Sequence, residues 1–251
     1  MNSELFFTAS ISVFTSEFCY FNQRRVALVQ TDLKYTRFDN RIPLPYHPIR
    51  IRTLRDTDQD SEFAADIMVD AFERKFIHVT SRRSLPSMRD FYGRSLRGRP
   101  PVFYERNFIA EYDGEMAGSC VLRYHGDNEL FPDVRDEDFA PVKCTDKCGL
   151  LCFALATAED IPPETCFLDH IGVDSKFRGK GIGKLLLDMA DTDARRKGCR
   201  MIYLSVATSN RSQRLYERQG YVVKEKKTLC CCGYWCTTGE REFAFMEKNL
   251  K

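Results

Sequence analysis

The sequence predicts a protein of the α/β (α+β) class whose sheet contains both parallel and antiparallel strands. Residues 167–173 and 200–207 have apolar residues at alternate positions, as strands do, and the helical pattern of residues 184–197 separates them. A strand, helix and strand at this spacing form a right-handed unit with parallel strands. The second observation is that two segments with alternating apolar residues flank Asp113-Gly114. This dipeptide is typical of the two-residue turn of an antiparallel hairpin, so antiparallel strands are predicted as well.

The composition is that of a globular chain that can bury a full core. The 251 residues, 43% of them hydrophobic, suffice for one domain with extensions or for one and a half domains. A net charge of +2, with acids and bases interspersed, argues against nucleic acid as a partner. No run approaches the roughly 18 to 20 apolar residues that span a bilayer. Residues 1–14 contain Glu4 and no basic segment, so we expect a cytoplasmic or nucleocytoplasmic protein.

In chain order, the first predicted feature is an extension at residues 1–47. It lacks a clean period and ends in a proline-rich stretch, so we expect it to be partly disordered or packed on the core. The main domain is expected at residues 48–251. Its first strand, Ile49–Leu54, alternates apolar and polar residues.

Two helices and the hairpin follow this strand. Asp56 or Thr57 caps a helix whose apolar residues lie three and four positions apart as far as Phe72. A weaker helix is predicted over residues 84–97, with a proline in its first turn. The hairpin at residues 107–123 comes next.

A glycine-rich turn, Arg178-Gly-Lys-Gly-Ile-Gly183, joins the strand at 167–173 to the next helix. The first backbone N–H groups of a helix lack partners and lie at the positive end of its dipole, and glycines let a phosphate approach them. We therefore expect a ligand that carries a diphosphate. The alternative is a glycine-rich helix start on a basic surface loop.

Two other glycine-rich turns do not fit this sequence. A P-loop places Ser or Thr after Gly-Lys, but Leu185 follows Gly183-Lys184, so the hydroxyl that binds magnesium is missing. The dinucleotide fingerprint reads Gly-x-Gly-x-x-Gly, and Gly179, Gly181 and Gly183 have a different spacing.

Two motifs, in this order, resemble the signatures of the GNAT N-acetyltransferase family. The first is Arg-x-x-Gly-x-Gly, formed by Arg178, Gly181 and Gly183. The second spans residues 210–221, which read as Asn, a short helix that bears Tyr216, and then Gly-Tyr. This second motif argues against an unrelated nucleotide-binding βαβ protein.

The resemblance covers roughly residues 48–250 and implies the GNAT acyl-CoA N-acyltransferase fold, a mixed, mostly antiparallel twisted sheet flanked by helices. In this fold the two parallel strands splay apart, and the pantetheine arm of acetyl-CoA inserts between them. The implied co-substrate is therefore acetyl-CoA, and no metal is expected. The implied cofactor-binding residues are Ile171, Gly172, Val173, Arg178, Gly179, Lys180, Gly181, Ile182, Gly183, Lys184, Asn210 and Tyr216.

The resemblance also implies the chemistry, in which an amine attacks the thioester carbonyl and CoA leaves as a thiolate. In the family a backbone N–H of the motif strand polarises the carbonyl, here around Ile171 to Val173, and the Tyr216 hydroxyl lies near the sulfur. An amine with a pKa near 10 must first lose a proton. The position where some relatives carry a catalytic Glu or Tyr falls near Phe167, which cannot act as a base.

Asp169 is the first candidate for the general base, with His170 and Glu164 behind it. Strand alternation puts Asp169 on the same face as Phe167 and His170 on the other face. For each candidate a structural hydrogen bond or a surface position is the alternative role. The predicted catalytic residues are Tyr216, Asp169 and His170.

Residues 126–163 form a long insertion relative to compact members of the family. Its acidic half would suit recognition of a cationic amine acceptor, although a solvated acidic loop explains it equally well. Its apolar half, which holds Leu150, Leu151 and Phe153, is expected to form an added strand or short helix that packs on the sheet.

Eleven cysteines, an odd number without a secretory signal, indicate reduced thiols. Two groups lack the Cys-x-x-Cys pairs of zinc fingers, although together they could supply four zinc ligands if they met in space. Small buried thiols, or S-palmitoylation of the second group, are the alternatives. The first group is Cys144, Cys148 and Cys152, and the second is Cys230, Cys231, Cys232 and Cys236.

Two hypotheses of function follow. The first is an acetyl-CoA-dependent N-acetyltransferase that acts on a primary amine of a small molecule, peptide or protein. The second is a GNAT-like domain that binds CoA as a sensor or scaffold without turnover. Tyr216 favours the first, whereas Phe167 leaves room for the second. Either is expected to be a monomer or a homodimer.

Overall fold

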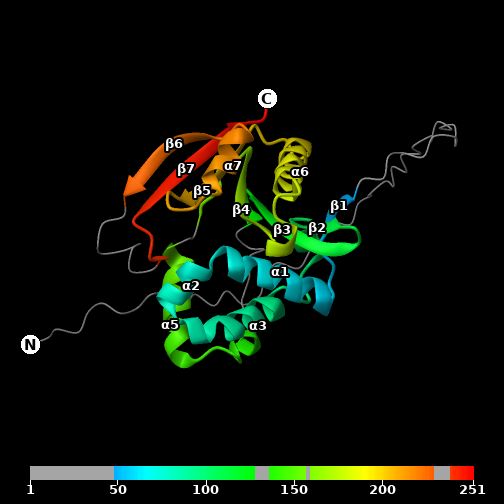
Figure 1. Ribbon diagram of the computed structural model, residues 1–251. Helices are drawn as coiled ribbons and strands as arrows, with labels where there is room; N and C mark the ends of the chain where they lie inside the picture. Colours follow the sequence, from blue (N-terminus) through cyan, green and yellow to red (C-terminus); the bar gives the residue numbers. More distant parts are fainter. Residues whose placement is uncertain (1–47, 128–135, 157–158, 229–237) are drawn as a thin grey trace, which may run out of the picture. The chain divides into compact units, whose positions relative to one another are not determined.

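The computed structural model describes residues 48–127, 136–156, 159–228 and 238–251 (Figure 1). The extension expected at residues 1–47 lies outside them, so its boundary at residue 48 stays a prediction. Most of the acidic half of the insertion and the cysteines from position 230 to 236 also lie outside the described residues.

Seven strands of the described residues form one sheet, in the order β1-β2-β3-β4-β5-β7-β6. β4 and β5 are parallel, and every other neighbouring pair is antiparallel. The expected mixed, mostly antiparallel sheet is therefore confirmed. The strands are β1 Ile49–Thr53, β2 Asn107–Tyr112, β3 Glu115–Tyr124, β4 Thr165–Val173, β5 Met201–Ala207, β6 Val222–Thr228 and β7 Glu242–Asn249.

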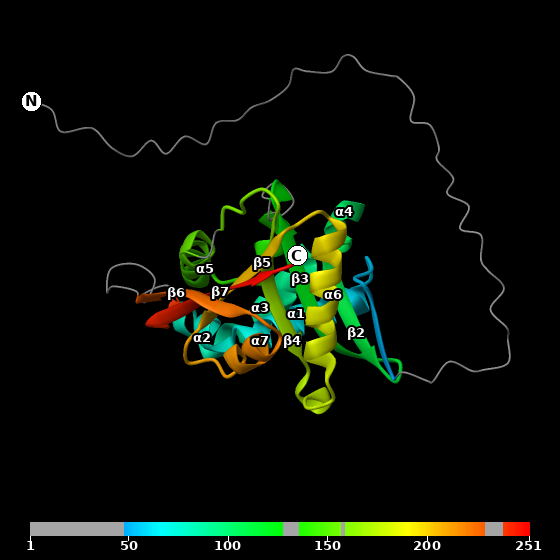
Figure 2. The same cartoon turned by 90° about the horizontal axis from the view of Figure 1, so that it is seen from above.

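Helices cover both faces of this sheet (Figures 1 and 2). The α1 face carries α1 (Asp58–Ala71), with α2 (Glu73–Val79) and α3 (Leu85–Ser95) packed beside it. The α6 face carries α6 (Ile182–Arg196) and α7 (Gln213–Arg218). None of the described helices has the length and apolar character needed to cross a bilayer. The shorter elements are α4 Pro101–Tyr104 and the 3-10 helices η1 Arg82–Ser84, η3 Asp136–Phe139 and η4 Ser175–Phe177.

Local sequence signals explain the first elements. The Thr57 hydroxyl caps α1 by accepting a hydrogen bond from the backbone N–H of Asp60, at 3.3 Å. α1 ends just before Phe72, whose φ of −110° and ψ of 14° are no longer helical, and α2, which the sequence pattern did not separate, begins after it. In the hairpin Asp113 and Gly114 both have positive φ, 51° and 85°, as a type I′ turn requires.

The buried side chains form two main clusters. One lies between the sheet and the helices α6 and α7, and the other joins α2, α3 and the insertion helix α5 (Cys144–Ala156). Burying these large apolar groups holds both helical layers in place, because each removes apolar surface from water. Members of the first cluster include Leu122, Leu168, Leu186, Ile202 and Met246, and members of the second include Phe76, Met88, Leu150 and Phe153.

The apolar half of the insertion is a helix that packs on α2. The Phe153 ring of α5 contacts those of Phe72 and Phe76, with centroids 6.5 and 5.5 Å apart. The sequence left a strand and a helix open and expected either to pack on the sheet. The structure has the helix, packed on the α2 layer, while Leu151 on its outer side is 61% exposed.

Five cysteines of the described residues are free thiols. Cys120, Cys166 and Cys199 are free and buried in the cluster beneath α6. Cys144 and Cys148 are exposed on α5, and their spacing of four is that of successive helical turns. Within the described ranges, no group of three or more His, Cys, Asp or Glu residues is arranged to hold a metal ion.

Candidate active site

β4 and β5 pair over three positions only and then separate. Their parallel register joins Thr165–Phe167 to Met201–Tyr203, and from Leu204 onward β7 is the one described strand that pairs with β5. Over Leu168–Val173, β4 has a described partner strand on its β3 side but none on its β5 side. The predicted splay of the parallel pair is therefore confirmed, and the open edge of β4 leaves backbone groups available to a ligand.

A β-bulge in β4 places Asp169 and His170 on the same face of the sheet. Between Leu168 and His170 the register advances by one residue on β3 and by two on β4, so Asp169 is the extra residue. Its carboxylate lies 3.1 Å from His170 Nδ1, and the His170 ring contacts Phe72 on the α1 face, with centroids 6.2 Å apart. The expectation that His170 points away from Asp169 was wrong, because the bulge interrupts the alternation.

The bulge pair combines an ionised carboxylate with an oriented imidazole. Burial by itself raises the pKa of Asp169, but the hydrogen bond and charge of His170, together with Arg123 Nη1 at 3.6 Å, outweigh burial and lower this pKa. An ionised carboxylate can only accept hydrogen bonds, so His170 Nδ1 donates to it. In the neutral ring Nε2 then remains as an acceptor, which is the state that a general base requires.

Neither Phe167, at the position where some relatives carry the base, nor Glu164 is suited to act as the general base. The Phe167 ring packs on that of Tyr203 in β5, with centroids 5.1 Å apart. Glu164 precedes β4 and forms an ion pair with Arg200 Nε at 3.1 Å. Along an extended strand it lies roughly 20 Å from His170.

The turn between β4 and α6 presents a row of backbone N–H groups. Gly179 and Gly181 have φ values of 80° and 83°, a left-handed conformation that glycine adopts without strain. From Arg178 to Lys184, no backbone N–H donates a hydrogen bond to any described residue. These groups lie at the N-terminus of the 15-residue helix α6, where the helix dipole adds positive charge. The arrangement suits a diphosphate.

Cationic side chains flank this row of N–H groups. Arg178 Nε donates to the carbonyl that ends β4, at 3.2 Å, and Lys180 Nζ lies 4.0 Å from the centre of the Tyr112 ring. Neither has a carboxylate partner among the described residues, so both can meet a phosphate. Lys184 pairs with Asp188 at 2.6 Å, so its backbone N–H is the part of the residue available to the turn.

Three predicted cofactor positions at the end of β4 also serve the packing of the fold. Ile171 and Val173 pack against the cluster beneath α6. Gly172 faces α1, where a Cβ would lie 2.4 Å from Ile67 Cγ2. A side chain at position 172 would therefore force the Ile67 side chain of α1 to move.

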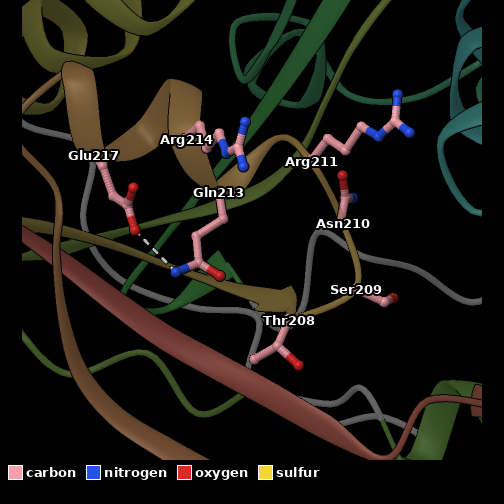
Figure 3. A pocket seen from close by; sticks show the side chains of 7 residues that line it. All are labelled: Thr208, Ser209, Asn210, Arg211, Gln213, Arg214 and Glu217. Atoms are coloured by element: carbon pink, nitrogen blue, oxygen red, sulfur yellow. Dashed lines mark hydrogen bonds between the residues drawn. The ribbon is translucent and has the colours of Figure 1, made fainter.

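A pocket of about 530 Å³ opens where β5 leads into α7 (Figure 3). α7 lies beside the glycine-rich turn, because a Cβ on Gly183 would be 3.2 Å from Leu215 Cδ2. Ser212 occupies the cap position of α7, and Asn210 Oδ1 accepts a hydrogen bond from the Ser212 N–H at 2.9 Å. The pocket is lined by Thr208, Ser209, Asn210, Arg211, Gln213, Arg214 and Glu217.

Arg211 and Arg214 are cationic residues of this pocket that the sequence analysis missed. Gln213 Nε2 donates a hydrogen bond to Glu217 Oε1 at 2.9 Å (Figure 3). Neither arginine has a carboxylate partner in the described part of the chain. Guanidinium groups bind phosphates in a bidentate manner. Two arginines three positions apart, just after Asn210, were the signal available in the sequence.

Tyr216 reaches the buried centre of the α6 face from α7. It is 8% exposed, and its ring lies edge to face against Tyr221, with centroids 5.9 Å apart. Burial, with a smaller effect of Cys120 on β3, raises the pKa of Tyr216, so the phenol is protonated at neutral pH. Its hydroxyl makes no hydrogen bond to a described residue and is available as a donor.

The mixed sheet, the splayed parallel pair and the glycine-rich helix start define a mixed α/β fold with a helix N-terminus that suits a diphosphate. The model of the acetyltransferase (GNAT) family matches residues 65–221, more than half of the chain, and the chain belongs to this family. No curated protein matches the sequence.

The solved structures that match the chain are distant from it in sequence. A crystal structure described as an acetyltransferase is 22% identical over 80% of this chain and 100% of its own, with a TM-score of 0.53. An N-acetyltransferase from Staphylococcus aureus Mu50 is 19% identical over 81% of this chain and 99% of its own, with a TM-score of 0.49. The PaiA N-acetyltransferase from Thermoplasma acidophilum, in complex with coenzyme A, is 17% identical over 80% and 98%, with a TM-score of 0.48.

Proposed function

We propose that the protein is an acetyl-CoA-dependent N-acetyltransferase that transfers the acetyl group to a primary amine by direct attack on the thioester. The observation that carries this proposal is the row of backbone N–H groups from Arg178 to Lys184, which follows β4 and has no hydrogen-bond partner among the described residues. Membership of the acetyltransferase family supports the same reaction class.

Three parts of acetyl-CoA find matching groups along this side of the sheet. The diphosphate binds the N–H groups of the turn, with Arg178 and Lys180 beside it. The pantetheine arm lies against the open edge of β4. The pocket with Arg211 and Arg214 offers cations to the phosphate on the ribose.

The bulge pair supplies the base on the α1 face. His170 Nε2 accepts the proton of the attacking amine, while the Asp169 carboxylate holds Nδ1–H and fixes the ring orientation. Asp169 is therefore a positioning residue, since its lowered pKa makes it a poor proton acceptor at neutral pH.

The leaving group is stabilised from the α6 face. Backbone N–H groups on the open edge of β4 polarise the thioester carbonyl, and Tyr216 donates a hydrogen bond to the departing thiolate. Because burial raises the pKa of Tyr216, the hydroxyl keeps its proton until the thiolate forms.

Thermal unfolding with and without CoA tests cofactor binding. A ligand with a micromolar Kd, present at a concentration about a thousand times that Kd, raises the free energy of unfolding by about 4 kcal/mol. No change in the melting temperature at millimolar CoA would refute the proposal. Release of free CoA in the presence of a panel of amines, peptides and protein N-termini then tests turnover. CoA binding without turnover of any amine would favour the sensor hypothesis, for which the absence of a base at Phe167 is the supporting observation.

A further inference from the structure

Lys75 on α2 has no part in the proposed reaction, yet it lies beside the β4–β5 splay. Its ammonium group lies over two aromatic rings, 4.7 Å from the centre of Phe72 and 5.0 Å from that of Phe243. No described carboxylate lies within ion-pair distance of it. Cation–π contacts, rather than an ion pair, therefore hold this amine.

The two rings stand on opposite sides of the splay. Phe72 contacts His170 of β4, with centroids 6.2 Å apart. Phe243 belongs to β7, beside α2 in Figure 1, and is the register partner of Ala207, the last residue of β5. Lys75 thus spans the opening between β4 and β5 on the face that carries His170.

The environment of Lys75 makes its amine a nucleophile. Burial lowers its pKa to about 8, although the charges of Glu240 and Asp169 act in the opposite direction. About half of the amine is then neutral at pH 8, compared with less than about 1% for an ordinary lysine. His170, the candidate base, lies next to the Phe72 ring on which the ammonium rests.

We propose that Lys75 is an internal acceptor, and that the protein transfers an acetyl group from acetyl-CoA to Nζ of its own Lys75. This inference rests on the proposed function, because it requires the thioester to lie in the splay. The neutral amine attacks the carbonyl carbon, a C–N bond forms and the C–S bond breaks. CoA leaves as a thiolate and takes up the proton that the amine loses. The product is an uncharged amide, so the reaction removes the positive charge at this opening.

Isotope labelling followed by peptide mass spectrometry tests this proposal. The full chain is incubated with acetyl-CoA that carries a ¹³C-labelled acetyl group, and trypsin then yields a labelled peptide of residues 75–82 if Lys75 is modified. Lys147 is the internal control, because its ammonium group also lies over a ring, that of Phe139 on η3, which belongs to neither strand of the splay. Lys75→Arg and the matched control Lys147→Arg complete the set.

The expected result is labelling of Lys75 at least about tenfold faster than of Lys147, because an amine held beside the thioester reacts as an intramolecular group. The rate should not depend on protein concentration, and free CoA should suppress it. Lys75→Arg should lose the label and keep the thermal shift with CoA, and Lys147→Arg should keep both.

Two outcomes would overturn the inference that Lys75 is an internal acceptor and leave the proposed function standing. One is CoA binding with Lys75 labelled no faster than Lys147. The other is a labelling rate that rises with protein concentration, which means transfer between molecules. A chain that does not bind CoA would overturn both this inference and the proposed function.

Discussion

The two faces of the sheet meet the splay in different ways. On the α6 face the groups proposed to bind the ligand are backbone N–H groups, held by Gly179 and Gly181 within one turn of chain. On the α1 face the groups are side chains of His170, Phe72 and Lys75, brought together from β4 and from the α1–α2 junction. The α6 face therefore offers a fixed site for a cofactor, whereas the α1 face can change its specificity one side chain at a time.

This contrast separates binding from chemistry. Substitutions on the α1 face should change turnover and leave CoA affinity almost unchanged. Substitutions in the glycine-rich turn should do the opposite. Tyr216 is the intermediate case, since it lies on the α6 face and is proposed to act on the leaving group.

His170→Ala should have the largest effect. Removal of a positioned general base is expected to lower kcat by about 10² to 10⁴, while the Kd for CoA stays within a few-fold. The measurement is steady-state turnover with an accepted amine, together with CoA titration. His125→Ala is the matched control, because that imidazole bonds the carbonyl of Ile161 at 2.8 Å, away from the bulge. A His170→Ala enzyme with the parent kcat would show that the α1 face supplies no base through this residue.

Tyr216→Phe should come next. The variant keeps the ring that packs on Tyr221 and deletes the hydroxyl. We expect kcat to fall by about 10², the lower end of the range for positioned general acids. The lower end applies because a thiolate is already a tolerable leaving group. The Kd for acetyl-CoA should change little, as for an interaction made mainly in the transition state. Parent turnover in this variant would make Tyr216 a packing residue.

Gly181→Val should weaken CoA binding at least tenfold, about 1.4 kcal/mol. Gly181 has a φ of 83° and open space around its Cα, so valine brings both strain and an obstacle to the diphosphate. Gly198→Val is the control for strain alone, because Gly198 has a φ of 79°, equally open surroundings and a place at the far end of α6. Both should lose about 1–2 kcal/mol of stability in denaturant unfolding. Equal CoA affinity in the two variants would contradict ligand contact at the turn.

The same contrast explains how much of the molecule could be predicted from its sequence. The turn at Arg178–Gly183, the helix after it and the parallel strands on either side are local patterns, and the structure contains all of them. The direction of His170 depends on a bulge, which is set by pairing with β3 and which alternation along β4 does not reveal. The contact of Lys75 with Phe243 joins α2 to β7, elements that only the folded sheet brings together.

The smallest expected effect belongs to Arg211 and Arg214, and it sharpens the description of the α6 face. Each arginine is exposed, so its contact with a phosphate is worth at most about 1 kcal/mol, roughly a fivefold change in the Kd for CoA. If the pocket holds the phosphate on the ribose, the double variant Arg211→Ala, Arg214→Ala should lose affinity for CoA but not for dephospho-CoA, which lacks that group.

Arg218→Ala is the matched control, because it removes an exposed arginine from the last turn of α7 outside the pocket. It should leave both affinities unchanged. The measurement is calorimetric titration at low and high salt, since an exposed charge contact weakens as ionic strength rises. Equal loss of affinity for CoA and dephospho-CoA in the double variant would mean that the arginines meet the diphosphate, and that the pocket before α7 belongs to the turn rather than to a separate subsite.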